Sequence, residues 1–131
     1  MEILEKYIEE VTEDTRVDEI NVKDVSMRLP GLKHKWVARL INHKKGLYRL
    51  EREKEEIIEA TLKKVKERGD IQLSKAAMTA KISTIDSVKE LDAKIDETKA
   101  LVDYLEHVET TFRYMTNDLK NVIDIMRMEL T

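Results

Sequence analysis

Apolar positions in the C-terminal half of the chain recur every three or four residues, which is the spacing of one helix face. No Gly or Pro interrupts residues 70–131. The pattern predicts a long helix over about residues 84–129 with a coiled-coil-like seam whose register slips near residues 101–108. We expect this seam to join copies of the chain; it consists of Val88, Leu91, Ile95, Val102, Leu105, Val108, Phe112, Met115, Leu119, Val122 and Met126.

An acidic N-terminal segment, residues 1–29, opens the chain. Its first apolar residues are spaced as on a helix, and those that follow are scattered through polar sequence. One short helix and an irregular or short helical connector are therefore predicted. The helically spaced residues are Ile3, Leu4, Tyr7, Ile8 and Val11.

A second long helix is predicted over about residues 32–68, within a segment that spans residues 30–69. Pro30 and Gly31 predict a break before it, and Gly69 is suited to a left-handed C-cap after it. The remaining segment, residues 70–131, begins with a stretch that is either a loop or a short helix. Candidate N-caps of the last helix are Ser83, Thr84 and Asp86.

The composition agrees with an all-α chain that buries part of its apolar surface against other copies of itself. Of 131 residues, 41% are hydrophobic and 39% are charged, which favours charged helices with a narrow apolar stripe over a compact monomer. There is no Cys, so disulfides and thiolate metal sites are excluded and a reducing cytoplasm is expected. No apolar run is long enough for a membrane span, and the first ten residues lack the order of a signal peptide.

Charge is distributed unevenly around a net value of −3. Residues 1–24 and 86–131 are acidic, whereas residues 33–68 hold 12 Lys and Arg against 6 Asp and Glu. A helical wheel places the basic stripe of this second helix opposite its apolar stripe. Such a stripe is either a solvated face or a surface that follows a phosphate backbone. The candidate phosphate ligands are Lys33, Lys35, Arg39, Lys44, Lys45, Arg49, Arg52, Lys63, Lys64, Lys66 and Arg68.

Two aromatic residues accompany the basic stripe. Trp36 falls on the apolar side of the wheel, which favours packing over base stacking. Tyr48 lies between the two stripes, where both roles remain open. No metal-ligand spacing of histidines, phosphate-binding loop or nucleophile elbow occurs, so the sequence predicts a protein that is not an enzyme and uses no metal or cofactor.

One ordered set of residues resembles the UvsY family, the recombination mediators of T-even-like phages. In the second helix it consists of Lys35-Trp36, Lys44-Lys45, Arg49-Leu50-Glu51, Lys54, Leu62 and Arg68-Gly69-Asp70. In the last helix, Leu101-Val102-Asp103-Tyr104-Leu105-Glu106 and Asp118-Leu119-Lys120-Asn121-Val122-Ile123 are similar to the family's final helix. The resemblance covers about residues 30–128.

The resemblance implies a ring-like homo-oligomer of six or seven subunits that binds single-stranded DNA. It implies further that the protein helps a UvsX-type recombinase displace the single-strand-binding protein, without catalysis of its own, in the cytoplasm of an infected bacterial host. DNA contacts would lie on the basic helix and subunit contacts largely on the last one. The alternative from the residues alone is a helical structural or adaptor protein with a basic protein-binding face.

This sequence departs from the family at one place in the basic helix. Where the family has a basic pair two to three turns before the glycine turn, this chain has Glu59 and Thr61, which cannot be carried over as phosphate ligands. The nearby basic residues Lys63, Lys64 and Lys66 are the hypothetical replacement.

Overall fold

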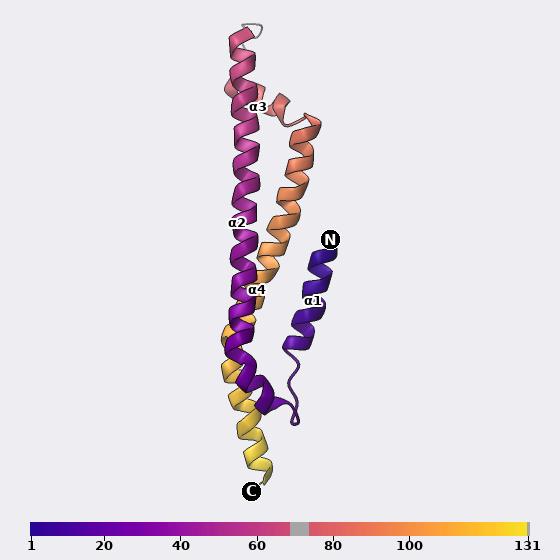
Figure 1. The fold of residues 1–131 in the computed structure, drawn as a ribbon, viewed down its shortest axis with the longest axis vertical. Coiled ribbons are helices and arrows are strands. Elements are labelled where there is room, and N and C mark those ends of the chain that lie inside the picture. The colour runs from indigo at the N-terminus through magenta and orange to yellow at the C-terminus, as the bar shows by residue number, and fades with distance from the viewer. Residues whose placement is uncertain (69–73, 131) are drawn as a thin grey trace. The chain divides into compact units, whose positions relative to one another are not determined.

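The computed structural model describes residues 1–68 and 74–130, and every regular element in them is a helix. The all-α class and the two long helices with a short N-terminal helix are thereby confirmed (Figure 1). None of the described helices is both long and apolar enough to cross a membrane. In chain order the helices are α1 Glu2–Asp14, α2 Val22–Arg68, α3 Lys75–Ile82 and α4 Asp86–Leu130.

The first of two compact units contains residues 1–42 and 101–131. Its core comes from the beginning of α2 and the end of α4, because α1 contributes no fully buried residue. Trp36 and Phe112 are the largest buried side chains, each about 1% exposed. The other buried residues in this unit are Val22, Val25, Leu29, Leu32, Leu40, Leu101, Val102, Leu105, Val108, Met115 and Leu119.

The second unit contains residues 43–100 and has a thinner core. Its buried apolar side chains come from α3 and the beginning of α4, whereas the described part of α2 in this unit contributes none. An ion pair between Lys54 Nζ and Asp92 Oδ1, 2.5 Å apart, links α2 to α4 here. The buried residues are Ile82, Val88, Leu91 and Ile95.

The predicted break at Pro30 is wrong. Helix α2 begins at Val22 and continues through Pro30 and Gly31. Pro30 is exposed and has no N–H to donate to the carbonyl of Ser26, so the helix lacks one backbone hydrogen bond there. Burial of the neighbouring apolar residues Val25, Leu29 and Leu32 offsets this loss. Helices in proteins draw most of their stability from such packing. Tertiary contacts therefore outweigh the helix-breaking effect of proline at this position.

A polar turn in the predicted connector starts α2. Asp18 Oδ1 accepts hydrogen bonds from the backbone N–H groups of Ile20 and Asn21, both 2.8 Å long. Asn21 Oδ1 in return accepts from the backbone N–H of Asp18 at 2.8 Å. This reciprocal arrangement resembles a capping box and satisfies donors that would otherwise be unpaired at the helix start. The Asp-x-x-Asn spacing was the available sequence signal for the earlier start.

Two of the three candidate N-caps of α4, Ser83 and Thr84, close α3 instead. The hydroxyls of Ser83 and Thr84 donate to the carbonyls of Ala80 and Lys81, each at 2.6 Å, so they satisfy the C-terminal end of α3. Asp86 is the first residue of α4 and places its carboxylate at the positive end of the helix dipole. The stretch predicted as a loop or a short helix contains α3, and the Gly69 cap lies outside the described residues.

The predicted seam of α4 is buried within a single chain. Nine of its eleven residues, from Val88 to Leu119, are fully buried without a second copy. Val122 and Met126 are half-buried, and the exposed apolar residues of this end of α4 are Ile125, Met128 and Leu130. Periodicity thus identified a buried face, while contacts between copies have to use surface that the chain leaves open.

Candidate nucleic-acid interface

The basic residues of α2 fall into two groups that differ in their surroundings. The first group lies against α1, which runs antiparallel to the beginning of α2 (Figure 1). Lys35 Nζ lies 3.0 Å from Glu10 Oε1 and 2.5 Å from Asp14 Oδ2. Arg39 Nη1 lies 2.5 Å from Glu10 Oε2. Two cations of the predicted phosphate-binding stripe are therefore paired with carboxylates of the same chain.

Trp36 is surrounded by this network and packs as the wheel indicated. Its Nε1–H donates to Asp14 Oδ2 at 2.9 Å, and the Tyr7 ring meets it edge to face with centroids 5.4 Å apart. The cationic groups of Lys35 and Arg39 lie 5.1 and 4.7 Å from its ring centroid, within cation–π range. We name Lys35, Trp36 and Arg39 the masked site, because α1 covers their polar and aromatic groups.

Acid is expected to loosen α1 from the masked site. A hydrogen bond from Arg39, aided by Lys35 and opposed by burial, holds the pKa of Glu10 below its ordinary value of 4.5. Because the pKa is lower in the folded chain, this stabilisation is present above pH 4.5 and is lost as pH falls through the folded-state pKa. The emission of Trp36, the only tryptophan, should change in that acid range, and Glu10→Gln should flatten the change.

The matched control for the acid transition is Glu5→Gln, because Glu5 is exposed on the same helix. This variant should keep the wild-type pH profile. A Glu10→Gln profile identical to that of the wild type would show that the pairing of Glu10 does not hold α1 in place.

The second basic group is open and surrounds an aromatic ring. Lys45, Tyr48, Arg49 and Arg52 recur at i, i+3, i+4 and i+7, so one face of α2 carries all four. They line a shallow depression of about 250 Å³, and Tyr48 is 64% exposed. Within the described residues none of the three cations has an ion-pair partner. We name these four residues the open patch.

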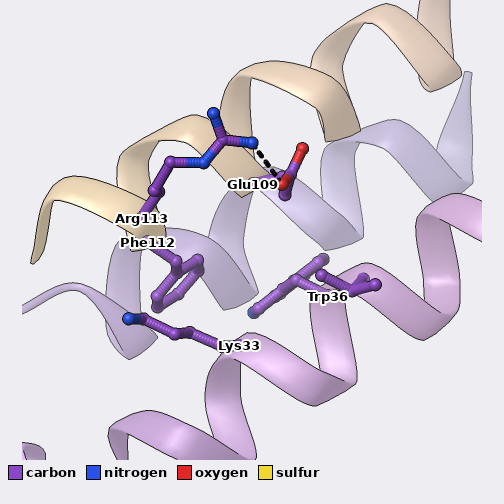
Figure 2. A pocket seen from close by; sticks show the side chains of 6 residues that line it. Lys33, Trp36, Glu109, Phe112 and Arg113 are labelled. Carbon is purple, nitrogen blue, oxygen red and sulfur yellow. Dashed lines mark hydrogen bonds and ion pairs between the residues drawn. The ribbon is translucent and has the colours of Figure 1, made fainter.

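A small cavity in the first unit involves Lys33 (Figure 2). It has a volume of about 150 Å³ between α2 and α4, and Trp36 and Phe112 form its aromatic part. Arg113 lies beside it in an ion pair with Glu109, 2.7 Å apart, and Lys33 Nζ donates to Thr116 Oγ1 at 3.1 Å. Lys33 is therefore directed toward α4.

The other predicted phosphate ligands are spread along α2. Lys44 is half-buried, and Lys63, Lys64 and Lys66 are exposed near the end of the helix. The side chain of Arg68 lies outside the described part of the chain. Thr61 donates its hydroxyl to the carbonyl of Ile57 at 2.8 Å, and Glu59 is exposed. At the two positions that depart from the family, the Thr61 hydroxyl is thus hydrogen-bonded within its own helix and Glu59 is an exposed acid.

The described residues hold no cluster of His, Asp and Glu suited to a metal ion. His107 Nδ1 lies 2.7 Å from the carbonyl oxygen of Asp103 one turn earlier, an ordinary helical contact. What the surface of α2 does supply is positive charge next to an exposed aromatic ring. This chemistry suits binding of a polyanion that also carries flat rings.

The fold and this surface define an all-α protein of long helices with a cationic, aromatic patch on one of them. The family model described as "Recombination, repair and ssDNA binding protein UvsY" matches residues 10–130. The chain therefore belongs to the UvsY family, a family of recombination mediators, and the resemblance in its sequence is confirmed.

A solved structure has the same fold. The crystal structure of the bacteriophage T4 recombination mediator protein UvsY matches with a TM-score of 0.82 and 21% sequence identity, covering 96% of this chain and 98% of that chain. No curated protein matches the chain in sequence. At this level of identity the structural match supports the arrangement of helices and leaves the roles of individual residues to the chemistry of this chain.

Proposed function

We propose that this protein is a recombination mediator that binds single-stranded DNA through the open patch. The observation that carries the proposal is the exposed Tyr48 ring among three cations without ion-pair partners in the described residues. The cations attract phosphates, and the ring offers a stacking surface for an unpaired base. Membership of a family described by single-stranded DNA binding supports the same conclusion.

The chemistry of the open patch favours single strands without sequence preference. Lys and Arg contacts to phosphates carry no base information, and every base has a face that stacks on an aromatic ring. In a duplex those faces are already stacked on one another. Acidic residues elsewhere on the chain do not cancel this attraction, because charge interactions are screened over about 8 Å at physiological salt.

We further propose that the chain acts as a homo-oligomer, a ring of six or seven subunits. Ile125, Met128 and Leu130 are exposed apolar residues near the end of α4, and Leu130 continues its buried face beyond the part that its own chain covers. A second copy would bury this apolar end. Repetition of the open patch around such an assembly would multiply weak phosphate contacts into tight binding. This supports a multivalent single-strand binder.

The mediator role implies two protein partners and no chemistry on the DNA. By holding single strands, the protein would help a UvsX-type recombinase to load onto DNA covered by single-strand-binding protein. Binding and handover need no general base, nucleophile or metal ion. The place of action would be the cytoplasm of the infected bacterial host.

Fluorescence anisotropy with labelled oligo-dT, at about 50 and about 200 mM salt, tests the proposal. Each phosphate neutralised on a single strand adds about 0.7 to the log–log salt slope, so three patch cations should add about 2 per engaged subunit. A duplex of equal length should bind more weakly. Binding that ignores salt or prefers the duplex would overturn the proposal, and absence of binding would favour an adaptor with a basic protein-binding face.

A further inference from the structure

We propose that the masked site is a second contact for single-stranded DNA and that α1 occupies it as an internal mimic of that ligand. The inference rests on the proposed function and adds a regulated part to it. DNA would have to displace α1 before it reached Lys35, Trp36 and Arg39. The open patch would then serve as the entry point and the masked site as the contact made after α1 leaves.

The contacts of α1 reproduce the chemistry of a single strand. Two carboxylates, on Glu10 and Asp14, take the place of phosphates against Lys35 and Arg39. The Tyr7 ring takes the place of a base, since it packs edge to face against Trp36. The three α1 residues are spaced i, i+3 and i+7 and therefore lie on one helix face.

The masked site has the composition of a single-strand site once α1 is removed. Two cations lie within about 5 Å of one tryptophan ring, at 5.1 and 4.7 Å from its centroid. Base–aromatic stacking with adjacent Lys or Arg is the recurrent way in which proteins bind single strands without reading sequence. Trp36 also lines the cavity toward Phe112, so contacts with α4 would keep the ring in position.

Helix α1 is held weakly enough to be displaced. None of its residues is fully buried, and most members of its ion pairs to α2 are partly exposed, with the side chains of Lys35 and Arg39 near 30% and that of Asp14 at 13%. Exposed ion pairs contribute little and are screened by salt. The connector of residues 15–21 keeps α1 close, so it competes as a tethered ligand whose effective concentration is high.

The test compares two variants that remove the same charge from α1. Glu10→Gln with Asp14→Asn replaces the two carboxylates that pair with the masked site by neutral amides. Glu5→Gln with Glu9→Gln replaces two exposed carboxylates of the same helix. If α1 competes with DNA, the first variant should bind oligo-dT about five- to tenfold more tightly than the second. Equal affinities of the two variants would mean that α1 does not compete and would overturn the inference.

Emission from Trp36, the only tryptophan of the chain, supplies a second readout. Saturating oligo-dT should quench the wild-type emission, because the ring exchanges Tyr7 for a base, and the Glu10→Gln/Asp14→Asn variant should reach the same quenching at lower DNA concentration. If anisotropy shows saturation while the emission stays constant, Trp36 remains covered and the inference fails while the proposed function stands. If neither protein nor variant binds oligo-dT, both fail together.

Discussion

Replacing Phe112 with alanine should strongly lower the free energy of unfolding of the first unit and should not release smaller folded assemblies. Phe112 is about 1% exposed within one chain and belongs to the core shared by α2 and α4. Truncation of a buried Phe removes transfer free energy and leaves a cavity, which together cost about 3–5 kcal/mol. That is a large share of the roughly 5–15 kcal/mol that stabilises a domain.

Thermal and urea denaturation, followed by circular dichroism, measure this loss, and light scattering reports the mass. Tyr114→Ala is the matched control, because Tyr114 is 59% exposed and lies two residues away on the same helix. The control should change the free energy of unfolding by about 0.5 kcal/mol or less. A Phe112→Ala protein that melts like the wild type but has a lower mass would place this part of the seam between copies of the chain.

Removing the three cations of the open patch should abolish most of the affinity for single-stranded DNA. Lys45→Ala, Arg49→Ala and Arg52→Ala together should lower the affinity for oligo-dT about 100-fold, because each cation bound to a phosphate contributes about 1 kcal/mol. The log–log salt slope should fall by about 2 per engaged subunit. Helicity should be unchanged, because all three residues are exposed and have no ion-pair partner in the described residues.

The control removes equal charge from the same unit of the chain. Lys89, Lys94 and Lys99 are exposed on α4, and their replacement by alanine should leave the salt slope unchanged. Tyr48→Ala separates the two parts of the proposed contact, since it should cost about 1–3 kcal/mol per stacked base without altering the slope. Equal reductions in affinity for both triple variants would show a nonspecific charge effect and would remove the open patch from the proposal.

The helical class and the approximate helix lengths could be predicted because their causes are local. Apolar spacing of three and four residues, together with the rarity of Gly and Pro, predicts long helices without knowledge of their neighbours. The prediction failed at Pro30, where a local penalty competes with burial of Leu29 and Leu32 that only the folded chain supplies. The start of α2 was missed for a different reason, because the Asp18 and Asn21 turn that begins it is a local signal that the prediction did not use.

For the candidate site, too, the sequence predicts which residues share a helix face but not what that face contacts. A helical wheel places Lys35, Arg39, Lys45, Arg49 and Arg52 on one basic stripe of α2, and all five are equivalent at that level. The tertiary structure separates them, because α1 returns along the first part of α2 and pairs its carboxylates with Lys35 and Arg39. The spacing of residues within α2 does not predict which other helix packs against each of its faces.

By itself, then, the sequence determined that this chain forms long helices, which faces of them are apolar or basic, and which family it resembles. Only the tertiary structure decided which residues each helix face contacts and which faces stay exposed. It covered most of the α4 seam with the chain's own helices, paired two of the basic residues with α1 and left the open patch exposed. The physical reason is that periodicity is a property of one helix, whereas burial and charge pairing depend on residues distant in the sequence.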